Sequence, residues 1–172
     1  LGRNQLIDNE VNTDYCRQNA IDIFRRKSGG GCIYADRGCI QFSYISRTSN
    51  AGEAFARYMR RMAGMLQGLK IDARLSGRND ILIDDTKVSG CAFYQLPNRS
   101  VLHNSLLFDT RLDHLSNALT PAREKLRSKG VESVRQRVAN VAAYTRLSIT
   151  SFMDYVQREM CGAEVLQLTD ED

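Results

Sequence analysis

The residues best suited to chemistry stand in one short stretch, Arg25-Arg26-Lys27-Ser28-Gly29-Gly30-Gly31. Glycine lets a backbone approach a ligand closely, and successive bare N–H groups can form a concavity that binds anions. Arginine adds a planar, permanently charged fork that suits phosphate or carboxylate. The stretch predicts an anion-binding loop; the alternative is a glycine-rich surface turn with incidental charge. Neither the Walker spacing nor the dinucleotide Gly-x-Gly-x-x-Gly pattern occurs here.

A second group of polar residues is Gly77-Arg78-Asn79-Asp80, followed by Lys87-Val88-Ser89-Gly90. Lys87, set among apolar and small residues, can hold a positive charge against a carbonyl or phosphate group as negative charge develops there. Asp80 is a candidate magnesium ligand, because Mg²⁺ commonly takes one or two carboxylates plus substrate phosphates. Asn79 can orient either group. The alternative is a solvated hairpin, since turns are rich in these residue types.

Three further residues have two readings each. His103 lies in an otherwise apolar strand, where a satisfied, partly buried histidine is the alternative to a ligand contact. Cys91 can act as a nucleophile only if His103 or Lys87 supplies a base or a positive field, so a buried inert thiol is the default. Ser133 can cap a helix whose N-terminus binds an anion, or that helix can present a solvated charged face.

Composition narrows the class of protein. The 172 residues are 42% apolar and 26% charged, which is ordinary for one globular domain, and no stretch approaches the ~18 apolar residues of a membrane span. A net charge of +4, with arginines spread along the chain and no tryptophan, argues against nucleic-acid binding. Five cysteines without metal spacing predict free thiols in a reducing cytoplasm.

Periodicity predicts strands followed by helices, an α+β arrangement. Expected strands are residues 21–26, 33–34, 40–45, 71–73, 81–83, 87–88, 92–94 and 101–108. Expected helices are residues 50–69, 112–119, one starting at Pro121, 134–144 and 149–160. Asp84-Asp85-Thr86 is placed at a hairpin turn.

Five motifs in order resemble the lipoate–protein ligase family. They are Arg-Arg-x-Ser-Gly-Gly-Gly-x-x-Tyr-x-Asp-x-Gly at 25–38, Gly-Arg-Asn-Asp at 77–80, Lys-Val-Ser-Gly at 87–90, His-x-x-Leu-Leu at 103–107, and Lys-Gly-Val-x-Ser-Val-Arg-x-Arg-Val-x-Asn at 129–140. Three positions depart from the family pattern: Ala35 replaces histidine, Cys39 replaces asparagine, and Asn104 replaces glycine. These departures affect polar contacts expected to a nucleotide or its metal.

The resemblance implies a fold and an activity. The fold is an α+β domain with a mixed β-sheet flanked by helices, like biotin and lipoate ligase catalytic domains. Residues 1–172 form a single catalytic domain, expected to lack the family's N-terminal segment and any C-terminal accessory domain. The activity is conversion of lipoate and ATP to lipoyl-AMP and pyrophosphate, then transfer of the lipoyl group to a lysine of an acidic lipoyl-carrier domain. Carriers of this kind belong to 2-oxoacid dehydrogenases or are the glycine cleavage H protein; octanoate is an alternative substrate.

The same resemblance implies roles for particular residues. Lys87 is the catalytic residue, bridging the lipoate carbonyl and the α-phosphate. ATP and the adenylate are bound, together with Lys87, by Arg26, Gly31, Cys32, Ile33, Tyr34 and Asn79. Lipoate is bound, together with Lys87, by Arg25, Ser28, Gly29, Gly30 and His103. Asp80 is the Mg²⁺ ligand.

Two other functions compete with this one. An octanoyl or lipoyl transferase uses no ATP and passes the acyl group through a cysteine, for which Cys91 is the candidate. A non-catalytic fragment holds lipoate or lipoyl-adenylate without turnover. ATP dependence and pyrophosphate release distinguish the three.

Overall fold

A computed structural model describes residues 1–48, 50–77, 79–119 and 138–162, together with 164, 166 and 169. Three sequence expectations lie outside the described residues. They concern Arg78, the helix starting at Pro121, and the first part of the 129–140 motif with its cap Ser133.

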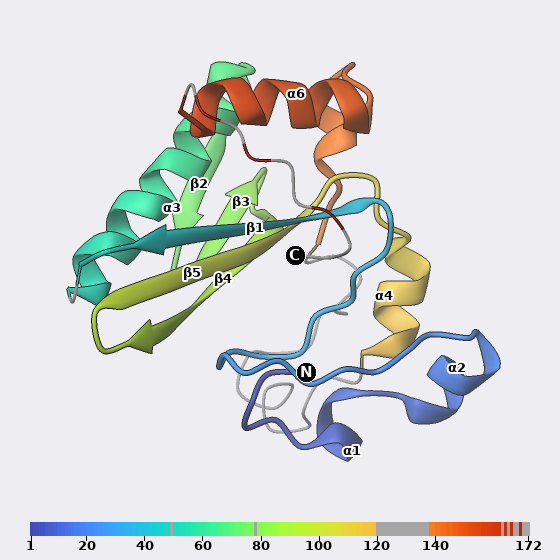
Figure 1. Cartoon of the computed structure of the whole chain (residues 1–172). Helices are drawn as coiled ribbons and strands as arrows, with labels where there is room; N and C mark the ends of the chain where they lie inside the picture. The colour runs from blue at the N-terminus through green and yellow to red at the C-terminus, as the bar shows by residue number, and fades with distance from the viewer. Residues whose placement is uncertain are drawn as a thin grey trace.

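Five strands form one sheet in the order β1-β5-β4-β3-β2 (Figure 1). The strands are β1 (Cys39–Ser46), β2 (Ala73–Ser76), β3 (Asp80–Ile83), β4 (Thr86–Leu96) and β5 (Arg99–Leu107). Their ladders are all antiparallel, and the parallel pairing among the described residues is the isolated bridge between Lys87 and Val138. The α+β class is confirmed, whereas the sheet expected to be mixed is antiparallel because each of its strand pairs from β2 to β5 is joined by a short turn.

Helices α3 (Ala51–Gly68) and α6 (Ile149–Met160) pack on one face of the sheet (Figure 1). Each begins at a polar cap: the Asn50 side chain accepts from the Glu53 N–H, and the Ser148 side chain accepts from the Ser151 N–H. The apolar stripe of α3 meets alternate residues of the strands, as its three- and four-residue spacing predicts. The largest fully buried side chains in this core include Phe108, Phe152, Met62, Leu66, Leu102 and Leu106.

The β3–β4 connection is a hairpin turn, as predicted, but it comprises only Asp84 and Asp85, because Thr86 already pairs with Ile83. Asp84 and Asp85 both have positive φ, 47° and 60°, the combination that a right-twisted hairpin favours. The two short strands expected at 87–88 and 92–94 are one continuous strand, β4, because Gly90 and Cys91 keep their pairing with β5.

The N-terminal region lies on the other side of the sheet (Figure 1). It contains α1 (Ile7–Glu10) and α2 (Thr13–Gln18), and α4 (Leu112–Ala118) packs beside α2. The strands expected at 21–26 and 33–34 are wrong: both segments are extended but form no ladder among the described residues. Leu1 makes two main-chain contacts with the first segment, donating to Phe24 O and accepting from the Arg26 N–H.

The helix expected at 134–144 is wrong for the described residues from 138 onward. Val138 bridges to Lys87, and the Ala139 N–H donates to Lys87 O. The Asn140 side chain bonds both the N–H and the carbonyl of Thr110. These tertiary contacts keep the chain extended up to Asn140, and a short 3-10 helix follows at Val141–Tyr144. Tertiary contacts here override the helical periodicity of the sequence.

None of the helices in the described part of the chain is long and apolar enough to cross a membrane.

Candidate active site

Lys87 and Asp80 form an ion pair on the side of the sheet that faces the N-terminal region. The Nζ–Oδ1 distance is 2.7 Å, and the two side chains are 39% and 34% exposed. The pair depends on a register shift: Ile81 faces Ser89, but Leu82 faces Lys87, so β4 has one extra residue at Val88. The extra residue moves Lys87 onto the face of Asp80 and sends Val88 into the core, where it is fully buried.

Gly90 gives the lysine its room. It lies opposite Asp80 in the β3–β4 ladder. A Cβ atom built on Gly90 would stand 2.9 Å from Lys87 Nζ and 3.0 Å from its Cε. In the Lys-Val-Ser-Gly motif, Lys87 therefore supplies a cation, Val88 is the extra residue that places its side chain on this face, and Gly90 leaves space beside it.

The glycine loop folds around the Arg26 side chain. Arg26 Nη2 donates to the carbonyls of Gly29 and Gly31, both at 2.8 Å. Gly30 has φ +93°, and its Cβ would lie 2.8 Å from that nitrogen and 3.2 Å from Ala92 Cβ on β4. Only glycine suits this position, which brings the loop against the same sheet face as Lys87. Burial lowers the pKa of Arg26, whose side chain remains a cation at neutral pH.

Arg25 and Ser28 anchor the loop from its other side. Arg25 Nη1 donates to the carbonyls of Gly2, Arg3 and Gln5 at 2.9, 3.1 and 2.7 Å, and Ser28 O accepts from the Arg3 N–H at 2.9 Å. A Cβ on Gly2 would stand 1.9 Å from Gly30 O, so the segment that starts the chain rests directly on the loop. The contacts of Arg25 and Ser28 in the structure position the loop.

His103 lies under the loop on β5, in register with Ala92 and Ser43. Its Nε2 atom is buried and has no hydrogen-bond partner among the described residues. Burial, and secondarily the charge of Arg26, lowers the pKa of His103. The ring is therefore neutral at physiological pH and faces the loop with one polar atom unused.

Asn79 contacts the backbone of β4 at Cys91. Its Nδ2 donates to Cys91 O at 2.8 Å, and its own carbonyl accepts from the Cys91 N–H at 2.8 Å. Cys91 is 3% exposed, and burial, followed by the charge of Asp80, raises its pKa to about 12. A thiol of this kind has almost no thiolate at neutral pH, so the default reading of Cys91 as inert is supported.

The departure at Asn104 belongs to the core. Its side chain, 1% exposed, donates to Ser89 Oγ at 2.9 Å and accepts from the Tyr58 hydroxyl. Successive side chains alternate across a strand, so Asn104 faces α3 while His103 faces the loop. The substitution therefore alters core hydrogen bonding and leaves the ligand face unchanged.

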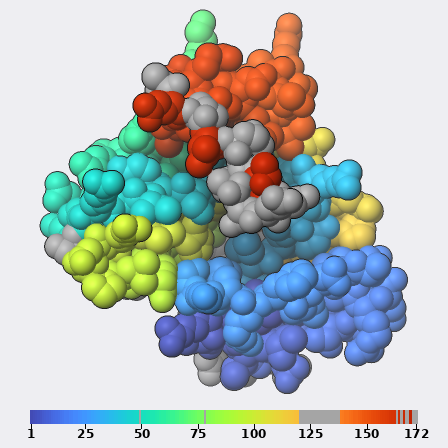
Figure 2. All heavy atoms as spheres, viewed as in Figure 1, coloured from blue at the N-terminus to red at the C-terminus, as the bar shows by residue number. Residues whose placement is uncertain are grey.

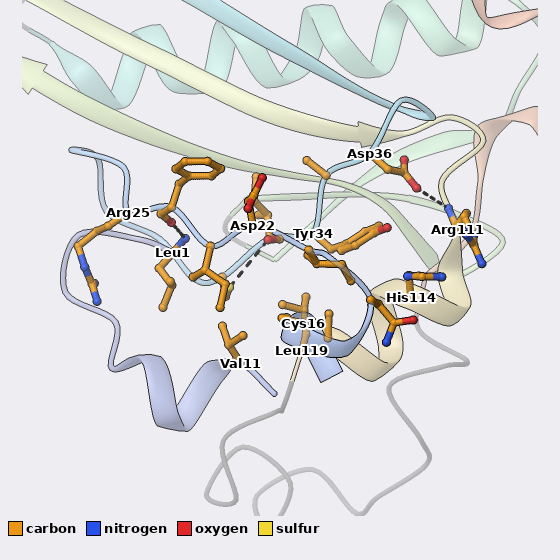
Figure 3. A pocket seen from close by; sticks show the side chains of 18 of the residues that line it. Leu1, Val11, Cys16, Asp22, Arg25, Tyr34, Asp36, Arg111, His114 and Leu119 are labelled. Carbon is orange, nitrogen blue, oxygen red and sulfur yellow. Dashed lines mark hydrogen bonds between the residues drawn. The ribbon is translucent and has the colours of Figure 1, made fainter. Parts of the chain in front are cut away.

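A cavity of about 880 Å³ lies between the N-terminal region and α4 (Figure 3). Cys32, Ile33, Tyr34, Arg25 and Arg26, which the sequence singled out, all line it. Figure 3 shows the Arg25 side chain reaching away from the cavity, in agreement with its carbonyl contacts. Sequence reasoning missed other residues of the wall: Asp22, Gln41, Arg111, His114, Val11 and Cys16.

Contacts distant in sequence build this wall. The rings of Tyr34 and His114 are 6.4 Å apart, and Asp36 Oδ2 accepts from the Arg111 N–H at 2.9 Å. Gly38 closes the junction, because a Cβ there would lie 2.0 Å from Asp109 O. The Asp-x-Gly part of the first motif thus holds the loop region against the end of β5. No periodicity in the sequence predicts the contacts with Arg111 and His114.

One row of residues links the cavity to the lysine. Gln41, in the cavity wall, faces Ser105, which faces Gly90, which faces Asp80. Three strand spacings separate the ends of the row, about 14 Å. Lys87, Asp80, Asn79 and His103 are not in the wall of the cavity that the described residues form. The arrangement suits a long ligand that reaches from the cavity to the lysine.

Comparisons with known proteins agree with this geometry. The family model described as the lipoyl protein ligase A/B catalytic domain matches residues 1–161. Lipoate-protein ligase LplJ of Bacillus subtilis is 36% identical over 165 residues, covering 93% of this chain and 49% of that protein. Lipoate–protein ligase 1 of Staphylococcus aureus is 38% identical over 178 residues, covering 100% and 54%. The chain spans about half the length of these curated relatives.

Solved structures support the same assignment. A bipartite lipoate protein ligase of Thermoplasma acidophilum, studied with its E2 lipoyl domain, has a TM-score of 0.81 at 32% identity, over 92% of this chain and 64% of that one. A lipoate-protein ligase A bound with ATP gives 0.80 at 29%, over 92% and 65%. The biotin protein ligase of Aquifex aeolicus, at 0.50 and 13% over 71% and 50%, shares the fold alone. The chain belongs to the lipoyl protein ligase A/B catalytic domain family.

Proposed function

We propose that this chain carries the catalytic core of a lipoate–protein ligase. It activates lipoate with ATP to lipoyl-AMP, releasing pyrophosphate, and passes the lipoyl group to a lysine of a lipoyl-carrier domain. The observation that carries the proposal is the Lys87–Asp80 pair, which the extra residue in β4 aims at the face covered by the glycine loop. A fixed ammonium group beside bare main chain is suited to a mixed carboxylic–phosphoric anhydride.

In the first step a lipoate carboxylate oxygen attacks the α-phosphorus of ATP. A P–O bond forms to the carboxylate, and the bond to the pyrophosphate oxygen breaks. Negative charge develops on the non-bridging α-phosphate oxygens, where the Lys87 ammonium group would stabilise it. Asp80, 2.7 Å away, holds this ammonium group in place before the nucleotide arrives.

In the second step the amine of the carrier lysine attacks the lipoyl carbonyl carbon. An amide bond forms, the bond to the AMP oxygen breaks, and the amine releases a proton to solvent. The carbonyl oxygen becomes an oxyanion in passing, and the same Lys87 would stabilise it, so one cation serves both steps.

The remaining assignments follow the geometry of the site. Cys32, Ile33 and Tyr34 line the cavity and would hold the adenosine, with Arg26 and Gly31 at the phosphates. The lipoyl chain would pass beside Gly29, Gly30 and the neutral His103. Arg25, Ser28 and Asn79 would act by positioning the loop and β4. The long separation between cavity and lysine supports a ligand with two arms.

A magnesium ion would be held chiefly by the substrate. Among the described residues, no three His, Cys, Asp or Glu side chains gather as a metal site. The lone carboxylate of Asp80 fits Mg²⁺ that takes its other ligands from phosphate oxygens and water. When bound, the ion would neutralise phosphate charge on the leaving pyrophosphate.

Partner and compartment are part of the proposal. One structural relative was studied with its E2 lipoyl domain, which supports a carrier of the 2-oxoacid dehydrogenase type. The H protein as carrier and octanoate as substrate are the alternatives to test beside it.

All five cysteines are free, which supports a reducing cytoplasm. We further propose that residues 1–172 act as one catalytic unit. The acyl-cysteine route has no support, because Cys91 is buried and protonated.

The test is pyrophosphate release from lipoate, ATP and Mg²⁺, followed by mass spectrometry of a lipoyl domain. Lys87→Ala should lower the rate of adenylate formation about 100- to 1,000-fold, because one preorganised cation is lost. Arg60→Ala, an exposed change on α3, is the control and should keep the full rate. An unchanged rate in Lys87→Ala refutes the role of the lysine. Binding of lipoate and ATP without pyrophosphate release refutes the ligase in favour of a binding fragment.

A further inference from the structure

A second cavity, of about 430 Å³, is lined by an unusual set of residues. They are four cations and one aromatic residue, Arg3, Arg25, Arg26, Lys27 and Tyr94, and no acidic residue of the described chain lines it. We call the four cations the basic cluster. Like charges this close repel one another, and that repulsion destabilises the folded state unless a partner supplies negative charge.

Two members of the basic cluster have no polar side-chain partner among the described residues. Arg25 and Arg26 direct guanidinium hydrogens at main-chain carbonyls of the loop and of the segment after Leu1. Arg3 and Lys27 are exposed, and their side chains make no hydrogen bond or ion pair with the described residues. Their charges are therefore available to a binding partner.

The basic cluster lies on the ligand face of the sheet. Tyr94 alternates with Ala92 and Gly90 along β4, so its side chain projects to the same side as the glycine loop. Figure 2 shows the blue N-terminal part of the molecule meeting the yellow-green β4–β5 strands on its surface. The cluster therefore lies on the same side of the sheet as Lys87 and on the opposite side from α3.

Distance indicates what kind of anion binds there. Lys87 Nζ lies beside Gly90, and Tyr94 is four residues further along the strand, about 13 Å away at the rise of a β-strand. A docked protein spans that distance, because a standard interface of about 800 Å² per partner corresponds to a disc of radius about 16 Å.

We propose that Arg3 and Lys27, the two exposed cations of the basic cluster, form the docking surface for the carrier protein, and that they bind carboxylates on the carrier surface around the target lysine. The inference rests on the proposed function, which requires that lysine to reach the adenylate at Lys87. The cluster draws the carrier in and orients it, and the chemistry takes place at Lys87.

Charge reversal tests the docking surface. The double variant Arg3→Glu/Lys27→Glu places two negative charges in it. The control Arg57→Glu/Arg60→Glu makes the same change in net charge on the exposed side of α3, across the sheet. Thermal unfolding of all three proteins verifies that they are folded. The measurements are the Kd of an apo lipoyl domain by calorimetric titration, its dependence on salt, and pyrophosphate release in the absence of the carrier.

The Arg3→Glu/Lys27→Glu variant should raise the Kd for the lipoyl domain at least about 10-fold and reduce the salt dependence, with pyrophosphate release within about 2-fold of wild type. A carrier with Glu→Lys changes beside its target lysine should bind this variant better than it binds the wild type. The control should bind as the wild type does.

Two results overturn the docking surface. One is a Kd equal to that of the control, and the other is a loss of pyrophosphate release as large as the loss of binding, which would assign the cluster to the nucleotide. Failure of the proposed function looks different, because the wild type itself would then release no pyrophosphate. The titration still decides on docking in that case, since it needs no turnover.

Discussion

The sheet and the N-terminal region hold their shapes by different balances of forces. Side-chain packing dominates in the sheet, whereas the N-terminal region has only a small apolar cluster, around Val11 and Cys16, and relies more on hydrogen bonds to main-chain carbonyls. Leu102 and Leu106 of the sheet are fully buried, and so is Phe152 of α6, which belongs to the same core. In the N-terminal region Phe24 is 76% exposed, and Arg25 alone donates to three carbonyls. The packed half fixes Lys87, and the hydrogen-bonded half supplies a loop that a ligand can reorganise at small cost.

The largest effect is expected at the junction of the two halves. Gly38→Ala places a Cβ 2.0 Å from Asp109 O and 2.3 Å from Asp109 C, both backbone atoms that cannot move freely. We expect a loss of ~4 kcal/mol or more in the free energy of unfolding by urea. Gly64→Ala, in α3 with no atom within 4 Å, should instead stabilise the protein by ~0.5–1 kcal/mol. Equal effects of the two substitutions on the free energy of unfolding would contradict a close backbone contact at Gly38.

The next effect tests the packed half. Asn104→Ala leaves the Tyr58 hydroxyl and Ser89 Oγ without their buried partner. Unfolding should become easier by ~2–4 kcal/mol, the cost of a cavity and of unsatisfied polar groups. Asn19→Ala removes an exposed bond to Tyr15 O and should change stability by less than ~0.5 kcal/mol. A small effect at Asn104 would contradict a core held by this network.

The hydrogen-bonded half should respond locally. Arg25→Met removes the bonds to Gly2, Arg3 and Gln5, and the site is exposed, so the global free energy of unfolding should fall by only ~1 kcal/mol. Amide hydrogen exchange at residues 2–5 and 28–30 should rise while protection of β4 and β5 stays constant. Arg17→Met, at an exposed pair with Asp14, is the control. Uniform loss of protection would show that the two halves unfold together.

The smallest effect on stability is expected within the loop. Gly31→Ala meets no atom within 4 Å and needs no positive φ, so stability should stay within ~0.5 kcal/mol. Pyrophosphate release should nevertheless fall, because the new Cβ occupies space beside the phosphates in the proposed site. The comparison with Gly30→Ala is informative, since that Cβ clashes with Arg26 and should lower both stability and rate. An unchanged rate in Gly31→Ala would place the nucleotide elsewhere.

The packed half could be predicted well because its helices and strands have a regular spacing of apolar residues. The apolar stripe of α3, the alternation in β1 and the turn at Asp84 and Asp85 all appear where expected. Alternation also separates His103 from Asn104, although the sequence interpretation placed both at the ligand. Extended segments 21–26 and 33–34 read as strands because apolar runs do not reveal whether a neighbour exists to pair with them.

The candidate site was predicted in its residue types more than in their arrangement. Lys87, Asp80 and Gly90 come together as the motifs indicated. Arg25 and Asn79, expected to contact ligand, form hydrogen bonds to main chain that the motifs did not predict. The cavity wall from His114 and Arg111 depends on how α4 packs, which no local pattern encodes.

The register shift at Val88 decides which side of the sheet carries the cation. If Val88 paired with Leu82 in a regular ladder, Lys87 would lie opposite Ile83 and its side chain would change sides. The ammonium group would then enter the apolar interior, and the reaction face would lose its cation without any change of residue type. Side chains along this strand can therefore be exchanged only as long as the shift at Val88 is kept.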